Sequence, residues 1–398
     1  MRALRVLQSF WQRRTPGYAL ARIAVLGLVA WLLIEWLVRA PAPSNDLQQD
    51  WPLTDFDRSL VPVEEFEPGG PPKDGIPAID KPHFVDINHA RRWLEEDAPV
   101  IAVRIDKEAR AYPIAILIWH EIVNDQIGDT PIAVTFCPLC NAALVFDRRV
   151  ENRALDFGTT GWLRSNDLIM YDRQTESWWQ QLTGKALVGA MAGERLNELP
   201  AQVIALGDFA AAYPDGRVLS RKTGYWREYG KNPYLGYDSM TSNPLAAPAP
   251  GDERLAPMTR VLAVNLPGAR KIYPLRAVKE QGLINDMIGD VPVVIMNGRA
   301  LRSPLDHAEI SRSRKVPAAT AFCREVDGQV LDFQPIDKAF EDLQTGSRWN
   351  IFGQAISGPL QGQQLKALPG GVHFAFAWLA FHPHSGIYQA EPDPASDD

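Results

Sequence analysis

Two cysteines separated by two residues carry the clearest chemical signal in this sequence. Cys137 and Cys140 enclose a proline and a leucine, and Cys323 is the only other cysteine of the chain. The pair follows the strand-like run 132–136 and precedes a second expected strand, so it does not begin a helix whose dipole would stabilise a thiolate. A turn between strands is instead typical of thiolates that bind a metal ion. Two thiolates fill half of a tetrahedral ligand shell, and other side chains must complete it.

The turn resembles the Cys-Pro-x-Cys-Gly knuckle of zinc ribbons and rubredoxins, with Asn141 in place of glycine as a residue able to adopt left-handed backbone angles. We expect His120 to be the third ligand, because two thiolates and an imidazole suit copper or zinc and leave one position open. Glu121 points in a different direction from its neighbour. It is better suited to orient a ligand or to accept a proton. The candidate catalytic residues are therefore Cys137, Cys140 and Glu121.

Much of the sequence occurs as two similar copies. The second copy lacks the histidine, the glutamate and the two cysteines of the first. The matched segments are 110–131 with 270–292, 146–157 with 322–333, and 172–179 with 342–349. At an offset of 161 positions, Gln281 and Gly282 replace His120 and Glu121, and Gly298 and Leu301 stand at the positions of the cysteines. What both copies share is most simply explained by the fold, so what one copy alone retains is a candidate for chemistry.

The pattern within each copy predicts an α+β fold that is predominantly β, built from two tandem homologous repeats. Residues 99–105 and 260–266 are typical of strands. Asp327-Gly328 lies between two strand-like runs and predicts a hairpin. One helix is expected in each copy, beginning at Pro113 and at Pro274, and Gly282 is expected to end the second of them.

The N-terminal part of the chain predicts a membrane anchor. A basic segment, residues 1–18, precedes the apolar run 19–38, which is long enough to cross a bilayer. The positive flank places the N-terminus in the cytoplasm and the bulk of the chain outside it, on a single-pass protein of the inner membrane facing the periplasm. A cleaved signal peptide, ending near Ala40-Pro41-Ala42, is the alternative.

The expected organisation after the anchor has five parts. They are a proline-rich spacer (39–85), the first repeat with the cysteine pair (86–220), an aromatic and proline-rich connector (221–257), the second repeat (258–388) and an acidic tail (389–398). The 398 residues carry a net charge of −7. A nucleic-acid partner is not expected, because binding phosphates needs a basic face.

Four segments together resemble the domain of unknown function 3179 (DUF3179) family over about residues 83–388. They are Trp119 to Asp125, Thr135 to Asn141, Met170 to Trp179 and Ala211 to Ser220. The resemblance implies a bacterial or archaeal protein of a kind that is often exported. It implies no established activity.

The sequence therefore favours a copper or zinc centre formed by Cys137, Cys140 and His120. Two alternatives stay open. The cysteines could cycle in a thiol-disulfide oxidoreductase, or they could form a structural disulfide in a binding module whose small-molecule or protein partner the sequence does not identify. Whether the protein is an enzyme is left open at this stage.

Overall fold

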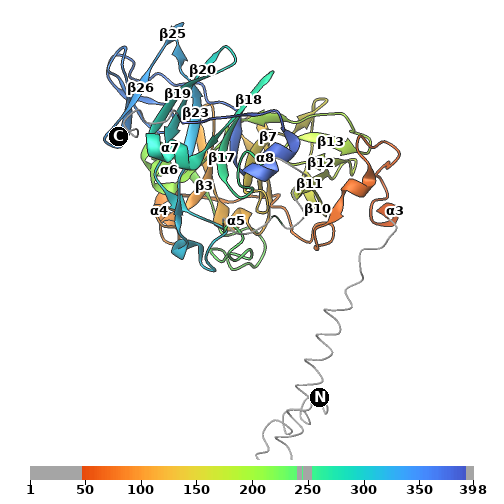
Figure 1. The fold of residues 1–398 in the computed structure, drawn as a ribbon. Helices are drawn as coiled ribbons and strands as arrows, with labels where there is room; N and C mark the ends of the chain where they lie inside the picture. Colours follow the sequence, from red (N-terminus) through yellow and green to blue (C-terminus); the bar gives the residue numbers. More distant parts are fainter. Residues whose placement is uncertain (1–46, 240–243, 245–252, 391–398) are drawn as a thin grey trace, which may run out of the picture. The chain divides into compact units, whose positions relative to one another are not determined.

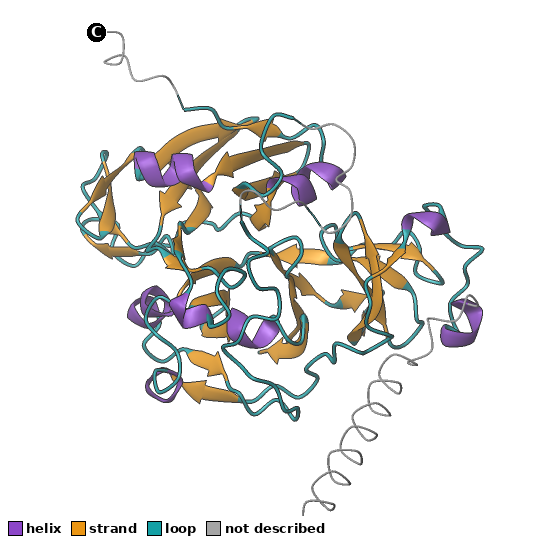
Figure 2. Cartoon of the chain, turned by 60° about the horizontal axis from the view of Figure 1, so that its bottom comes forward, coloured by secondary structure: helices purple, strands orange, loops and turns teal. Residues whose placement is uncertain are grey.

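The computed structural model describes residues 47–239, 244 and 253–390. The chain divides into two compact units, residues 1–52 and 53–398, and α3 (Leu47–Asp50) belongs to the first. The second unit is predominantly β, as predicted, with short helices between the strands (Figures 1 and 2). The expected anchor, residues 19–38, lies outside the described residues. Within the described ranges, no helix is both long and apolar enough to span a bilayer.

Three main sheets form residues 67–219, which we call the first half. One has the order β15-β3-β4-β16-β2, with β2 (Phe84–Asp86), β3 (Pro99–Ile105), β4 (Glu108–Pro113), β15 (Gln202–Ala205) and β16 (Arg217–Leu219). The next, β14-β7-β6-β5, contains β5 (Ile122–Ile127), β6 (Thr130–Cys137), β7 (Ala142–Asp147) and β14 (Asn197–Leu199). The last, β1-β10-β11-β12-β13, contains β1 (Glu67–Pro68), β10 (Phe157–Arg164), β11 (Asp167–Asp172), β12 (Trp178–Gln180) and β13 (Lys185–Val188).

Residues 260–387, the second half, also form three main sheets. They have the orders β30-β17-β18-β31, β19-β20-β23 and β26-β27-β28-β29. Their strands are β17 (Arg260–Leu266), β18 (Ala269–Pro274), β19 (Leu283–Ile288), β20 (Val291–Asn297), β23 (Ala319–Cys323), β26 (Phe333–Ile336), β27 (Ala339–Asp342), β28 (Arg348–Trp349), β29 (Ala355–Ser357), β30 (Gly370–Phe374) and β31 (Gly386–Ile387).

Short hairpins and helices connect these sheets. The hairpins pair β8 (Arg149–Val150) with β9 (Arg153–Ala154), β21 (Leu301–Arg302) with β22 (Lys315–Val316), and β24 (Glu325–Val326) with β25 (Gln329–Val330). The helices are η1 (Val63–Glu65), α4 (Ile87–Ala90), α5 (Ile114–Leu117), α6 (Leu206–Ala212), α7 (Leu275–Gln281), η2 (Ile310–Arg312) and α8 (Ala375–Phe381).

The strand pairings of the first half recur in the second with the same register. Val100 pairs with Pro113 as Val261 does with Pro274, Ile122 with Thr135 as Leu283 with Met296, and Phe157 with Asp172 as Phe333 with Asp342. Each half also has one parallel pair, β4 with β16 and β18 with β31. The same order of pairings therefore builds both halves.

A shared buried hydrogen bond explains one of the repeated sequence motifs. The indole Nε1 of Trp179 donates to Asp172 at 2.9 Å, and Trp349 donates to Asp342 at the same distance. Both tryptophans are fully buried. A buried carboxylate needs such donors to offset its desolvation, so these residues serve the fold of each half.

The local structure departs from the sequence predictions in three places. Pro113 and Pro274 precede the first helical residue rather than occupy it, while Gly282 ends α7 with a φ of 74°, as predicted. Each half contains a further helix, α6 or α8, directly after β15 or β30. The proline-rich segment is not a free spacer over its described part, because β1 pairs with β10 and β2 with β16.

Two connections differ greatly in length between the halves. Cys137 pairs with Ala142 across a four-residue turn, 138–141. The corresponding position in the second half is Gly298, whose amide donates to Ala318, and the chain between them is the 19-residue loop 299–317. Leu301 is therefore part of an inserted loop and not the structural counterpart of Cys140. The second connection is the hairpin of β26 and β27. It is shorter than the corresponding hairpin of β10 and β11, since β10 has eight residues and β26 has four.

Candidate functional site

The two cysteines lie at the ends of the turn between β6 and β7, and both are buried. Cys137 is the last residue of β6, and Asn141 adopts the left-handed conformation predicted for it, with a φ of 49°. The side chains of Cys137 and Cys140 are in the same core cluster as Val261 and Trp378 of the second half, and the backbone amide of Phe374 in β30 donates to the carbonyl oxygen of Cys140 at 2.9 Å. The thiols therefore face the interior between the two halves.

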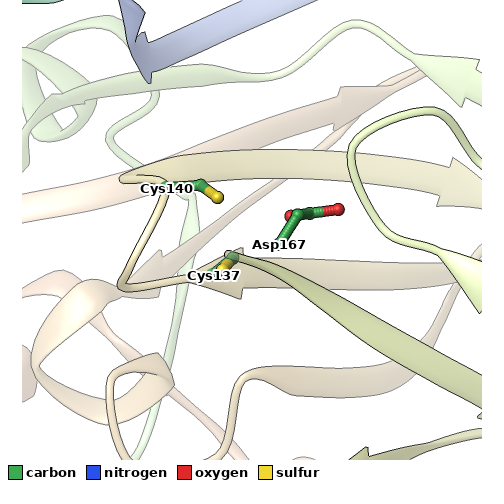
Figure 3. A group of neighbouring side chains, drawn as sticks. All are labelled: Cys137, Cys140 and Asp167. Carbon is green, nitrogen blue, oxygen red and sulfur yellow. The ribbon is translucent and has the colours of Figure 1, made fainter. Parts of the chain in front are cut away.

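A carboxylate joins the two thiols. The Sγ atoms of Cys137 and Cys140 and a carboxylate oxygen of Asp167 all lie within 4.8 Å of one another (Figure 3). Asp167 begins β11, directly after a two-residue turn in which Ser165 and Asn166 both have positive φ, 52° and 63°. The longer hairpin of the first half brings this turn to the cysteines. A buried Cys-Cys-Asp group of this kind could hold a metal ion.

The two oxygens of Asp167 have different surroundings. Oδ2 accepts hydrogen bonds from the side chain of Gln180 at 2.6 Å and from the backbone amide of Leu182 at 2.8 Å. Oδ1 is buried and has no hydrogen-bond partner. Leaving a buried polar atom without a partner costs about 1 to 3 kcal/mol. The thiols of Cys140 and Cys137 are the nearby donors that act on this carboxyl group, and their hydrogen bonds lower its pKa against the effect of burial.

The electrostatic environment of the group disfavours negative charge. Burial raises the pKa of Asp167 to about 7. Burial also raises the pKa of the Cys137 and Cys140 thiols, and the nearby Asp167 carboxylate adds to both effects. Both thiols donate to the backbone oxygen of Asn166, at 3.8 and 3.3 Å. Without a cation, the group therefore favours protonated thiols.

Glu121 occupies a strained backbone position beside this group. Its φ is 57°, and the corresponding residue of the second half is Gly282, with a φ of 74°. Left-handed angles cost a residue with a side chain roughly 1 kcal/mol or more. The side chain is 6% exposed, and burial raises its pKa to about 8, with Asp167 also contributing. The first half thus has a buried acidic side chain at a position where glycine would remove the backbone strain.

His120 does not join the thiols in the described structure. Its Nδ1 lies 2.7 Å from the carbonyl oxygen of Pro77, and its Nε2 lies 2.8 Å from the hydroxyl of Tyr229. Burial lowers the pKa of the ring to about 4, so the neutral ring donates to Pro77 and accepts from Tyr229. Both nitrogens of His120 are thus engaged elsewhere, and the described group that could hold a metal ion contains Asp167 rather than His120.

Cys323 lies apart from the group as well. It is half-buried on β23, at the position that corresponds to Asp147 of β7.

Asp167 itself was not a candidate from sequence. The signal that pointed to it was the absence of a counterpart for the adjoining residues Arg164 to Asn166 in the second copy. Chemistry-bearing residues in a duplicated chain are expected in such unmatched segments, but the length of the hairpin, which places Asp167 beside the turn, becomes evident only from the pairing of its strands.

The fold and the site together define a predominantly β protein with one buried thiol-carboxylate group. The chain belongs to the family described as "Protein of unknown function (DUF3179)", whose sequence model matches residues 73–385. No curated protein and no solved structure matches the chain.

Proposed function

We propose that the first half binds one divalent transition-metal ion between Cys137, Cys140 and Asp167. The observation that carries the proposal is the buried Asp167 carboxylate, one oxygen of which lies within 4.8 Å of the sulfur atoms of two buried thiols. Acidic side chains are stable in such a place when a cation faces them. In the described part of the chain, neither Asp167 nor Glu121 forms an ion pair with a lysine or arginine, and the causes that shift their pKa values include no such residue.

Zinc fits this ligand set better than copper. Zinc accepts thiolate sulfur and carboxylate oxygen in one tetrahedral shell, whereas copper(I) selects soft sulfur ligands. Binding releases the two thiol protons to the solvent, because the raised pKa of Glu121 keeps that carboxyl group protonated at neutral pH. The fourth ligand position is left for a water molecule, for Glu121 or for an external ligand.

A thiol-disulfide exchange function is less well supported. Its attacking group must be an accessible thiolate. Cys137 is 2% exposed and Cys140 is fully buried, and the pKa of both thiols is raised. These conditions disfavour a nucleophile and suit a ligand that loses its proton to an ion.

Elemental analysis of the full-length protein, purified without added metal, tests the proposal. We expect about one zinc ion per chain, and loss of the ion in Cys140→Ser and Asp167→Asn. Cys323→Ser is the matched control and should keep the ion, because Cys323 is outside the group. A metal-free protein with a disulfide between Cys137 and Cys140 would favour the redox alternative. A metal-free protein whose two thiols stay reduced and unreactive would contradict both chemical functions and favour the non-catalytic binding module.

We further propose that the two halves arose by duplication and that residues 19–38 anchor the protein in the inner membrane, with the rest in the periplasm. The common strand register supports the first statement. The basic flank and the apolar run support the second. N-terminal sequencing of the membrane fraction tests the anchor: a mature protein that starts near Pro43 would contradict it.

A further inference from the structure

The connector crosses the first half at the two residues that the second half lacks. We call its residues 223–238 the strap. The hydroxyl of Tyr229 lies 2.8 Å from His120 Nε2, and the hydroxyl of Tyr234 donates to Glu121 Oε1 at 3.4 Å. Two consecutive side chains of the first half are thus each held by one tyrosine of the strap.

The strap is held from its other side by the inserted loop 299–317 of the second half. The amides of Asn232 and Gly236 donate to the carbonyl oxygens of Ala308 and Asp306 at 3.0 and 2.8 Å, and the amide of Ile310 donates to Gly230 at 2.9 Å. The strap contains no helix or strand of its own. Its place therefore depends on these bonds, on the two tyrosine contacts and on its last residue, the fully buried Asp238, which forms ion pairs with Arg260 and Arg314.

Tyr234 lies directly at the thiol site. Burial raises the pKa of its hydroxyl, and the nearby Glu121 and Cys137 contribute in the same direction. Its ring also packs against the core cluster that contains both cysteines. Tyr234 thus stands between the buried thiols and the outer residues of the strap, of which Trp226 is 84% and Leu235 67% exposed.

The strap is not tightly packed along its whole length. A cavity of about 270 Å³ is lined by Tyr229, Gly230 and Lys231 of the strap together with Trp93 and Ile310. This space lets the middle of the strap move without first displacing the core.

We propose that the strap is the gate of the metal site, with the Tyr229–His120 and Tyr234–Glu121 contacts as its two latches. The ion enters and leaves when both latches open. This role also accounts for the absence of a histidine and a glutamate at Gln281 and Gly282. The purpose of the gate rests on the proposed function, whereas its effect on access to the thiols does not.

The test compares wild type with the double variant Tyr229→Phe/Tyr234→Phe, which removes both hydroxyls and keeps both rings. In full-length protein freed of metal by a chelator, the rate at which N-ethylmaleimide modifies Cys137 and Cys140 is measured by peptide mass spectrometry. Each lost hydrogen bond should raise the rate about fivefold, and the double variant about 25-fold. In zinc-loaded protein, transfer of zinc to a competing chelator should accelerate similarly.

Two controls separate gating from general loosening. Gln281 of the second half corresponds to His120, and its side chain accepts a hydrogen bond from the hydroxyl of Tyr388 at 2.8 Å. Tyr388→Phe removes this hydroxyl and should leave both rates unchanged. Modification of the half-buried Cys323 reports on general loosening of the second half and should also be unchanged. If the double variant reacts faster but the purified protein never contains zinc, the gate is supported and the proposed metal site is refuted. Unchanged modification rates in the double variant, or an equal increase at Cys323, would overturn the gate.

Discussion

Replacing Glu121 by glutamine isolates the free energy of holding a buried acid beside the thiols. The amide keeps the length of the side chain and can still accept from Tyr234, but it cannot ionise. In the metal-free protein, burial raises the pKa of Glu121 from 4.5 to about 8. The native state therefore holds a proton at pH 7 that the unfolded chain has lost.

The sign and size of the effect follow from this difference. Because the native protein binds more protons than the unfolded chain, its free energy of unfolding falls as pH rises from about 4.5 to about 8. One pKa unit corresponds to about 1.4 kcal/mol, so the loss at pH 7 is about 3 kcal/mol and at pH 5 it is under about 1 kcal/mol. Glu121→Gln removes this loss, and its stability relative to wild type should rise by about 2 kcal/mol between pH 5 and pH 7.

Urea unfolding followed by tryptophan fluorescence, with a chelator present, measures this change. Comparing two pH values cancels any constant effect of the amide, such as an altered hydrogen bond. Glu280→Gln on the exposed face of α7 is the control and should show no such rise. A difference between Glu121→Gln and wild type that stays constant from pH 5 to pH 7 would refute the reasoning.

Three further predictions concern the ligand set and the fold. His120→Ala should keep about one ion per chain by elemental analysis, since the ring nitrogens of His120 form hydrogen bonds elsewhere. Loss of the ion in this variant would support His120 as a ligand. Asp172→Asn should lower the free energy of unfolding by about 3 kcal/mol, because one of its two oxygens, which accept from the buried Trp179 indole and from the Thr175 amide, is replaced by an NH2 donor. Gly370→Ala should cost about 3 kcal/mol in the same urea assay, since its φ is 135° and a Cβ there would lie 2.1 Å from the carbonyl oxygen of Ala263. Changes under about 0.5 kcal/mol would contradict the last two.

Local backbone signals in the sequence predicted much of the fold. Asn141 and Gly282 have the positive φ values expected of them, and Asp327-Gly328 forms the turn between β24 and β25. Such signals succeed because left-handed angles are accessible to few residue types. The comparison of the two copies also gave the correct register, with Tyr112 and Tyr273 at corresponding positions of β4 and β18.

The candidate site was harder to predict because its members come together through connections of unequal length. Asp167 reaches the thiols only because the hairpin of β10 and β11 is long, and Ser165-Asn166 is a weaker turn signal than a glycine-containing pair. His120 was chosen because it is missing from the second copy. In the structure, its ring nitrogens instead contact the carbonyl oxygen of Pro77 and the hydroxyl of Tyr229 in the connector.

The loop 299–317 has a consequence for how readily the two halves could exchange roles. To install the thiol group in the second half, a 19-residue loop would have to become a four-residue turn, β26 would have to lengthen and Gly282 would have to give way to a strained glutamate. No one of these steps provides a ligand set alone, and shortening the loop removes the backbone acceptors and donors that position the strap over the other half. The difference between the halves is therefore hard to reverse by single substitutions, and variation in this family should alter the existing thiol-carboxylate group sooner than create a second one.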